Sequence, residues 1–424
     1  MIFDMDMVIH PSSLSGSIEA IPSKSHAHRL LICAAMADRP SFIALRGTND
    51  DIDATVRCLK ALGADIVYKD GGLHVTPISG RPKHAVLDCG ESGSTLRFLL
   101  PVAAALGIKS TFIGRGRLPY RPLEPLISRL REHGCTLSDE HLPITVSGKL
   151  TGGVYELPGN ISSQYITGLL LALPATGGGE IRITTELQSG RYVEMTIGVM
   201  KQFGIDVVQN GSVYSVPAGV YRSPGVVKVP GDWSNAAVWL CAGALSGRIS
   251  VSGLSLDDAQ GDSAVVGILR KFGADVAIDG NIVTVQKAPL AGITVDAGDI
   301  PDIIPPVAFV AANACGYTNI INAGRLRLKE SDRLSALAHN LEALGCIVWE
   351  TSDSLRIMGQ ETTSGGKLNG YNDHRIVMSA VVGGVNSVEG VTVSDSEAVN
   401  KSYPDFFTDF RRLGGKANVK QPGK

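Results

Sequence analysis

The sequence repeats one local pattern six times along its 424 residues. In each copy, a segment with helical periodicity ends at a glycine and is followed by alternating residues typical of strands. Asp70-Gly71 is one of the turn dipeptides expected between such strands. A glycine after a helix allows the positive φ that ends it. The six glycines, spaced 69 to 72 residues apart, are Gly63, Gly134, Gly204, Gly273, Gly345 and Gly414.

A second element recurs with the same period, namely a few polar residues followed by an apolar helix. The bodies of these helices are uniformly apolar, which predicts helices buried on all sides. The helices that end at the glycines are amphipathic and should lie outside. We therefore predict an α/β protein of six repeated units, three in each of two domains. The polar segments are expected to cap these helices, and they begin near Ser23, Glu91, Ser162, Asp232, Pro301 (followed by Asp302) and Asn372.

The boundary between the two predicted domains falls in Pro224–Gly231, which two Pro-Gly pairs interrupt. The strand that precedes Pro22 is expected to complete the second domain. The predicted domains are therefore 22–228, for substrate binding, and 1–21 with 229–424. The active site is expected in the cleft between them.

Charge and composition exclude several classes of function. The formal net charge is −2, so no general positive field favours nucleic acid or an anionic membrane as a partner. No apolar stretch reaches 18 residues, and no signal peptide is visible, which predicts a cytoplasmic protein. The seven cysteines form no CxxC pair, so we expect neither a disulfide framework nor a zinc site.

Cations beside the polar helix starts point to an anionic ligand. The N-terminus of a helix carries unsatisfied N–H groups and binds anions. Capping alone would explain the serines, asparagines and aspartates at these positions. It would not explain Lys24, Arg29 and Arg375, because a cation beside a positive helix end is disfavoured unless an anion joins it.

Two further basic segments lie outside these starts, Arg115–Pro122 and Arg325–Arg333, together with Lys401. A solvated turn and a salt-bridged helix start are the alternatives for the two segments. No P-loop, HExxH, complete dinucleotide fingerprint or serine nucleophile elbow is present. We therefore expect acid–base chemistry on a strongly anionic substrate, with no metal and no cofactor.

Five segments together resemble the EPSP synthase (3-phosphoshikimate 1-carboxyvinyltransferase) family, in order and over nearly the whole chain. They are Pro22–Arg29, Leu118–Pro122, Leu328–Arg333, Asn372–Arg375 and Lys401–Phe407. The resemblance implies a two-domain inside-out α/β barrel of six βαββαβ repeats, three per domain, and a monomer. It also implies transfer of the enolpyruvyl group of phosphoenolpyruvate to the 5-hydroxyl of shikimate 3-phosphate. That reaction releases phosphate and proceeds by addition and elimination through a tetrahedral intermediate, without a cofactor.

The resemblance also implies roles for individual residues. Asp302 would accept the proton of the attacking hydroxyl, Glu330 would deliver a proton to the methylene carbon and later remove one, and Lys24 would assist. The residues implied for shikimate 3-phosphate are Lys24, Ser25, Arg29, Ser162, Ser163, Gln164, Ser189, Tyr192, Asp302 and Lys329. Those implied for phosphoenolpyruvate are Lys24, Gly93, Arg121, Gln164, Arg333, Arg375 and Lys401. Their cations would offset two phosphates, about −1.5 to −2 each, and two carboxylates.

Some features depart from the family or leave alternatives open. Glu91 stands where many family members have Asn, and Arg325 stands where some members have a substrate-binding Asn. Because Gly93 lacks a Cβ near the implied phosphoenolpyruvate site, inhibition by glyphosate is a hypothesis. The first alternative is the sister transferase acting on UDP-N-acetylglucosamine, which uses a cysteine in the loop matching Gly114–Pro122, where this chain has none. The second is a non-catalytic anion-binding protein, which would not need the Asp302 and Glu330 pair.

Overall fold

The computed structural model describes residues 5–420, which form six four-stranded sheets and twelve α-helices. Contacts divide them into two units, 22–230 and 5–21 with 231–420. Each unit holds three of the sheets. The α/β class and the six repeats, three per unit, are thereby confirmed. The sheets are separate four-stranded sheets and do not pair into a closed barrel within the described residues. Residues 1–4 and 421–424 of the predicted second domain lie outside the described part.

One repeat illustrates the order of elements within a unit. Its strands β6 (His84–Asp88) and β7 (Lys109–Ile113) pair in parallel, and a helix crosses between them. A hairpin then follows the outer helix, and its second strand pairs antiparallel with β7. The inner helix is α3 (Gly93–Leu106), the outer helix α4 (Leu126–Glu132), and the hairpin β8 (Cys135–Leu137) with β9 (Ile144–Gly148).

This order is βαβαββ, which differs from the predicted βαββαβ. The reason is topological, because a parallel pair needs a crossover helix, whereas a tight turn joins only antiparallel strands. The strand after the inner helix therefore finds its antiparallel neighbour only after the outer helix.

The other two repeats of unit 22–230 have the same order. In one of them the first strand, β14 (Val226–Lys228), comes from the end of the unit and pairs in parallel with β3 (Ser41–Ala44). That repeat continues with α1 (Lys24–Ala35), β3 (Ser41–Ala44), α2 (Asp50–Ala61), β4 (Asp65–Lys69) and β5 (Gly72–Thr76). The other comprises β10 (Gly153–Leu157), α5 (Ser163–Ala172), β11 (Gly178–Ile183), α6 (Gly190–Gln202), β12 (Val208–Asn210) and β13 (Val213–Pro217).

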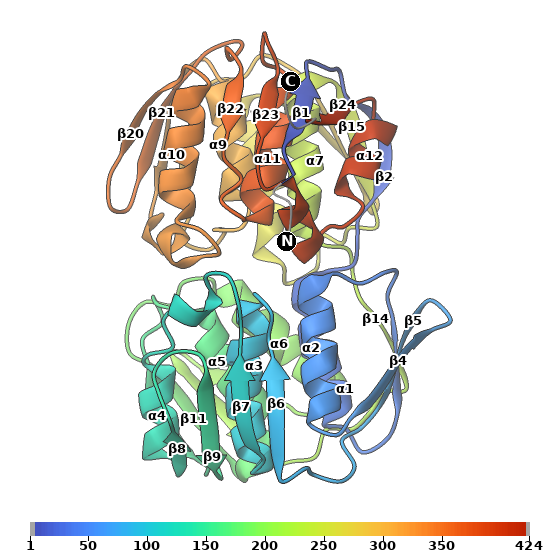
Figure 1. Ribbon diagram of the computed structural model, residues 1–424, viewed down its shortest axis with the longest axis vertical. Coiled ribbons are helices and arrows are strands. Elements are labelled where there is room, and N and C mark those ends of the chain that lie inside the picture. Colours follow the sequence, from blue (N-terminus) through green and yellow to red (C-terminus); the bar gives the residue numbers. More distant parts are fainter. Residues whose placement is uncertain (1–4, 421–424) are drawn as a thin grey trace. The chain divides into compact units, whose positions relative to one another are not determined.

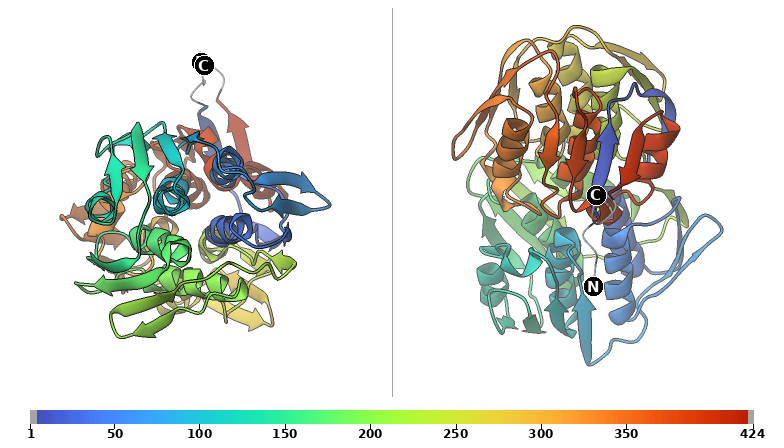
Figure 2. Two further views of the ribbon diagram at one scale, coloured as in Figure 1. Left: turned by 90° about the horizontal axis from the view of Figure 1, so that it is seen from below. Right: turned by 45° about the horizontal axis from the view of Figure 1, so that its top comes forward.

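In the second unit, two N-terminal strands complete sheets that the C-terminal half begins. Strand β1 (Met7–His10) lies between β23 (Val391–Val393) and β24 (Lys416–Val419), as the blue strand among red ones in Figure 1 and Figure 2 shows. Strand β2 (Ser15–Glu19) pairs in parallel with β15 (Arg248–Ser252).

The remaining elements of this unit complete its three repeats. The first repeat has α7 (Trp233–Ser246), β15 (Arg248–Ser252), α8 (Val265–Phe272), β16 (Asp275–Asp279) and β17 (Ile282–Gln286). The second has β18 (Thr294–Asp296), α9 (Ile304–Ala312), β19 (Gly316–Ile321), α10 (Arg333–Ala343), β20 (Ile347–Glu350) and β21 (Leu355–Gly359). The third has β22 (Gly366–Leu368), α11 (His374–Gly384), β23 (Val391–Val393), α12 (Phe406–Arg412) and β24 (Lys416–Val419). Short 3₁₀ helices are η1 (Leu118–Tyr120), η2 (Leu173–Thr176), η3 (Gly261–Ala264), η4 (Gly324–Leu328) and η5 (Ser396–Lys401).

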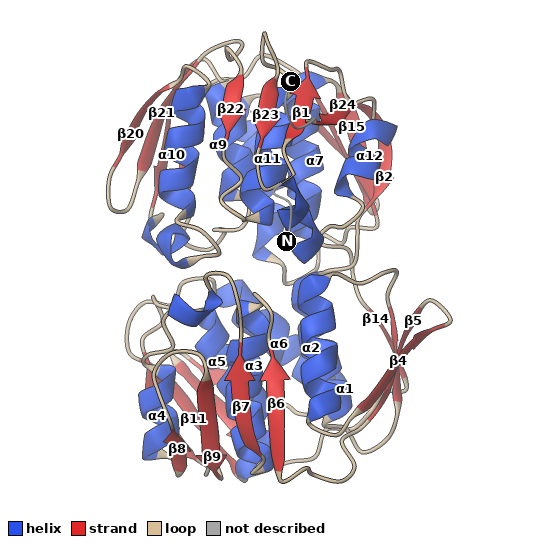
Figure 3. Ribbon diagram, in the orientation of Figure 1, coloured by secondary structure: helices blue, strands red, loops and turns tan. Residues whose placement is uncertain are grey.

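The inner helices form the core of each unit, as their apolar sequences predict. Every residue of α7, α9 and α11 is buried, and these three helices pack against one another. Strands β23 and β1 lie over α11 (Figure 3). In the other unit α3 packs against α5. The outer helices are only partly buried, as α2 and α6 show. No helix within residues 5–420 has the length and hydropathy to cross a bilayer.

The repeated glycines end the outer helices as predicted. All six adopt positive φ, between 78° at Gly204 and 106° at Gly63. In the hairpin between β4 and β5, Asp70 and Gly71 both have positive φ, which is the backbone of a type I′ turn. Of the cysteines, all but Cys315 are buried, where they pack as small apolar residues.

Candidate functional site

The N-termini of the inner helices follow the predicted capping pattern with one exception. Five of them begin after a side chain that accepts a backbone N–H bond, namely Ser23, Ser92, Ser162, Asp232 and Asp373. Helix α9 does not, because Ile303 occupies its N-cap and Pro305 and Pro306 lie in its first turn. Prolines have no N–H group, so fewer donors need a cap there. The expectation that Asp302 helps cap this helix is therefore wrong.

Asp302 instead takes part in ion pairs. Its Oδ1 lies 3.2 Å from Lys329 Nζ and 2.8 Å from Arg333 Nη1. Its Oδ2 lies 4.0 Å from Arg375 Nη2. Three predicted site residues, two from Leu328–Arg333 and one from Asn372–Arg375, thus surround one carboxylate.

Arg333 is the centre of this arrangement, and its side chain is only 1% exposed. Its Nε lies 2.8 Å from Asp373 Oδ2, and its Nη2 lies 2.7 Å from Glu330 Oε2 and 3.2 Å from Asp373 Oδ1. Burial alone would lower the pKa of Arg333, but the carboxylates of Asp373, Glu330 and Asp302 raise it above its ordinary value. Burial alone would raise the pKa of Asp373, but the Arg333 guanidinium outweighs the effect of burial and holds that pKa below its ordinary value.

Lys329 and Arg375 complete what we call the Arg333 cluster (Asp302, Lys329, Glu330, Arg333, Asp373 and Arg375). Burial lowers the pKa of Lys329, and the nearby Arg333 adds to this effect while Asp302 opposes it. Arg375 donates to the Ser234 carbonyl at 3.0 Å and hydroxyl at 2.6 Å. Burial acts to lower the pKa of Arg375, but the negative charge of Asp302 leaves it raised.

Lys401 lies near the same helix start. It is buried, and its Nζ donates to the carbonyl of Asn372 at 2.6 Å. That carbonyl belongs to the residue just before Asp373. All the predicted site residues of this unit are therefore at or beside the starts of α9, α10 and α11.

In unit 22–230, Arg29 is a buried cation with neutral partners. Its side chain donates to the hydroxyls of Thr196 at 2.8 Å and Thr167 at 3.3 Å, and to the carbonyls of Ser25 at 2.7 Å and Tyr192 at 3.0 Å. Its guanidinium also lies over the Phe98 ring. No carboxylate among the described residues pairs with it. Burial accordingly lowers the pKa of Arg29 to about 10.

The other predicted residues of this unit lie at neighbouring helix starts. Lys24, the first residue of α1, pairs with Asp51 at 2.8 Å. Ser162 caps α5, and Ser163 is its first residue. Ser189 precedes α6 in the left-handed region, with φ of 57°.

Gly93, the first residue of α3, faces two guanidinium groups. A Cβ at this position would lie 2.7 Å from Nη1 of Arg121 and 2.7 Å from Nη1 of Arg97. Arg97 donates to Gln164 Oε1 at 3.0 Å, and Gln164 Nε2 donates to Ser94 Oγ at 3.0 Å. We call Gly93, Ser94, Arg97, Arg121 and Gln164 the Gly93 cluster. It joins the positive ends of two inner helices to two cations.

Sequence reasoning missed Asp51, Arg97 and Asp373 as members of these clusters. Asp373 lies in a family segment and was interpreted only as a helix cap. Arg97 had a usable signal, because it is the only charged residue of α3. Asp51 belongs to an acidic first turn in α2 that a helix dipole explains equally well.

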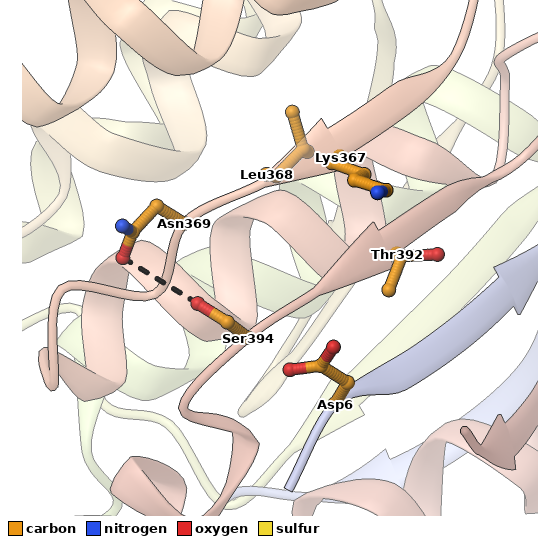
Figure 4. A pocket seen from close by; sticks show the side chains of 6 residues that line it. All are labelled: Asp6, Lys367, Leu368, Asn369, Thr392 and Ser394. Atoms are coloured by element: carbon orange, nitrogen blue, oxygen red, sulfur yellow. Dashed lines mark hydrogen bonds between the residues drawn. The ribbon is translucent and has the colours of Figure 1, made fainter. Parts of the chain in front are cut away.

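A shallow pocket of about 220 Å³ lies on the sheet that contains β22, β23 and β1 (Figure 4). Asp6, Lys367, Leu368, Asn369, Thr392 and Ser394 line it. Asp6 is already paired with Lys420 at 3.1 Å, and Asn369 contacts Ser394 at 3.4 Å. None of the predicted site residues lines this pocket.

Comparisons with known proteins agree on one family. The family described as EPSP synthase (3-phosphoshikimate 1-carboxyvinyltransferase) matches residues 8–410. A 3-phosphoshikimate 1-carboxyvinyltransferase of Clostridium novyi is 40% identical and covers 98% of this chain and 99% of its own. Its namesake in Clostridium acetobutylicum is 41% identical and covers 96% and 97%. An EPSP synthase structure from Acinetobacter baumannii has a TM-score of 0.81 at 25% identity and covers 98% of this chain and 100% of its own.

Proposed function

The chain belongs to the EPSP synthase (3-phosphoshikimate 1-carboxyvinyltransferase) family, and from this premise we propose how its residues divide the work of the reaction. The protein is a transferase of the shikimate pathway, which leads to the aromatic amino acids. It transfers the enolpyruvyl group of phosphoenolpyruvate to the 5-hydroxyl of shikimate 3-phosphate and releases phosphate. We also propose that the protein acts as a monomer in the cytoplasm.

The buried, unbalanced charge of Arg29 is the observation that carries the binding proposal. Taking a cation out of water is costly unless an anion compensates it. Arg29 has only hydroxyl and carbonyl partners, so shikimate 3-phosphate would supply the missing negative charge. Its neighbours in this role would be Ser25, Ser162, Ser163, Ser189 and Tyr192. Arg is suited to the task because its planar guanidinium can bind a carboxylate or phosphate through two bonds.

Replacing Arg29 with methionine should weaken the binding of shikimate 3-phosphate without unfolding the protein. Charge-assisted hydrogen bonds contribute about 1.5–3 kcal/mol, so the affinity should fall about 10- to 100-fold. The apoprotein should keep its melting temperature, because the substitution also removes an uncompensated buried charge. Calorimetric titration and thermal unfolding would measure both effects. Thermal protection by shikimate 3-phosphate equal to that of the wild type would contradict the assignment.

The Gly93 cluster is proposed to hold phosphoenolpyruvate. Arg121 and Arg97 lie against the first residue of α3, where the N-terminus of the helix adds further positive potential. Gln164 connects this site to the start of α5. Lys24 would contribute a further cation, although Asp51 already balances it in part.

Gly93→Ala should raise the KM for phosphoenolpyruvate at least about tenfold, equivalent to about 1.4 kcal/mol. The new Cβ would have to displace the guanidinium ends of Arg121 and Arg97, which are flexible enough to move without unfolding the protein. Gly198→Ala is a matched control, because a Cβ there meets no atom within 4 Å. Steady-state kinetics at saturating shikimate 3-phosphate would show the difference. The same assay tests competition between glyphosate and phosphoenolpyruvate.

The Arg333 cluster is proposed to carry out the proton transfers. Asp302 would take the proton of the attacking hydroxyl, and Glu330 would protonate the methylene carbon and later remove a proton. One guanidinium contacts both carboxylates, at Asp302 Oδ1 and Glu330 Oε2, and so sets their relative position. Lys329 would support Asp302 and contact shikimate 3-phosphate.

Arg333 itself was predicted to bind phosphoenolpyruvate, and its contacts limit how many of its N–H groups can do so. Of the five N–H groups of an arginine, four are used by Asp302, Glu330 and Asp373. One Nη1 N–H group has no acceptor among the described residues. We propose that this group reaches phosphoenolpyruvate, with Arg375 and Lys401 as further ligands.

A direct assay would test the function as a whole. Purified protein should release phosphate only when both substrates are present, and a chelator in the buffer should make no difference. Saturable binding of both substrates without turnover would favour the non-catalytic anion-binding alternative. Phosphate release with UDP-N-acetylglucosamine in place of shikimate 3-phosphate would favour the sister transferase.

A further inference from the structure

A chain of buried polar side chains begins at His28 and crosses three helices. His28 Nδ1 lies 2.7 Å from Thr55 Oγ1, which lies 2.7 Å from Thr95 Oγ1. Thr95 Oγ1 donates to Ser92 Oγ at 2.8 Å. All four side chains are at most 1% exposed. The other ring nitrogen of His28, Nε2, is buried without a partner among the described residues.

The donors in this chain determine the tautomer of His28. A hydroxyl has a single proton, and Thr95 donates it to Ser92 Oγ at 2.8 Å or to the Asp51 carbonyl at 3.5 Å, and in neither case to Thr55. Thr55 must therefore donate to Thr95, and His28 Nδ1–H must donate to Thr55. Nε2 is then an unprotonated acceptor, and an orphaned lone pair is tolerated in a buried site more readily than an orphaned N–H group. Burial, Lys24 and Arg29 lower the pKa of His28, which agrees with a neutral ring.

The chain connects the helix starts that carry proposed ligands of phosphoenolpyruvate. His28 lies one helical turn after Lys24 on α1, and Thr55 lies one turn after Asp51 on α2. Ser92 and Thr95 flank the start of α3, where Gly93 lies. The bonds therefore join the Lys24–Asp51 ion pair to the Gly93 cluster through the interior of unit 22–230.

We propose that His28, as the neutral Nδ1–H tautomer, is a positioning residue that holds Lys24 and Gly93 in register for phosphoenolpyruvate. The proposal rests on the proposed binding roles of those two residues. His28 itself touches no substrate in this scheme. It acts through Thr55 and Thr95, and its loss lets the start of α1 move relative to the start of α3.

Kinetics of three variants test this role. His28→Leu and Thr55→Val should each raise the KM for phosphoenolpyruvate about tenfold, the effect of one lost buried hydrogen bond, with the dissociation constant of shikimate 3-phosphate unchanged. The double variant should match either single one, because both substitutions break the same chain. Thr196→Val is the matched control, since it removes a buried hydroxyl bonded to Arg29. It should raise the dissociation constant of shikimate 3-phosphate and leave the KM for phosphoenolpyruvate unchanged. Additive effects in the double variant, or equal effects on both substrates, would overturn the proposal.

Nitrogen NMR of the wild-type protein gives a test that needs neither turnover nor a stable variant. The His28 ring should show a protonated Nδ1 and an unprotonated Nε2. A ring protonated at Nε2, alone or together with Nδ1, would refute the hydrogen-bond direction and with it the proposal. Failure of the wild type to release phosphate from the two substrates would count against the proposed function and would leave this spectrum unchanged.

Discussion

Glu330→Gln is expected to lower the turnover number by about 10²–10⁴-fold, the usual contribution of general acid–base catalysis. Glutamine keeps the size of the side chain and can still accept the bond from Arg333 Nη2, but it cannot exchange a proton at pH 7. Binding of both substrates should change far less than turnover. Phosphate release measured together with equilibrium binding of each substrate would separate the two effects.

Glu342→Gln is the control for this experiment. Glu342 lies on α10, the helix that follows Glu330, and its side chain is exposed, so the substitution changes the net charge equally. It should leave turnover unchanged. A Glu330→Gln enzyme within a fewfold of wild-type turnover would remove Glu330 from the proposed proton transfers and leave Asp302 as the remaining candidate.

Arg333→Met is expected to cost about 3–5 kcal/mol in the free energy of unfolding at pH 7, because it breaks a buried ion pair and strands one partner. Asp373 is fully buried, and Arg333 is its main source of positive charge. The control is Arg182→Met, which breaks an exposed pair with Glu180 and should cost at most about 1 kcal/mol. Denaturant unfolding monitored by circular dichroism would give both values.

The pH dependence of this effect has a definite sign. In the wild type the pKa of Asp373 is lowered on folding, so its contribution is present above the unfolded value of about 3.9 and is lost as the pH falls through the folded value. In Arg333→Met, burial should raise that pKa instead, so the variant loses stability as the pH rises. The difference between the two proteins should therefore shrink from pH 7 towards pH 4. A constant difference over this range would contradict the buried ion pair as its cause.

Local signals accounted for most of what sequence reasoning predicted correctly. Gly63 and its five counterparts end helices because a positive φ is a property of one residue and its neighbours. Ser92 and Ser162 cap helices for an equally local reason. The predicted order of strands within a repeat was wrong. Pairing depends on which strands a crossover brings side by side, and the periodicity of a sequence carries no information about this.

The candidate site shows the same difference between what local sequence signals predict and what tertiary packing decides. Resemblance to the family assembled the set of residues, but it did not say which of them contact one another. Asp302 was expected to cap a helix, and the prolines of α9 together with Arg333 gave it another role. Arg97 was overlooked although its charge in helix α3 was a signal in the sequence, and the structure then placed it beside Gly93.

By itself, the sequence determined the six repeats, the buried and exposed helices, and the family, since each depends on short-range patterns or on motifs compared one at a time. Tertiary structure alone decided which charges are balanced. Arg333 meets Asp373 across 40 residues, whereas Arg29 reaches Thr196 across 167 residues and meets no carboxylate within the described chain. Both cations are buried, and the energy of a buried charge is set by the groups packed around it rather than by its neighbours in sequence.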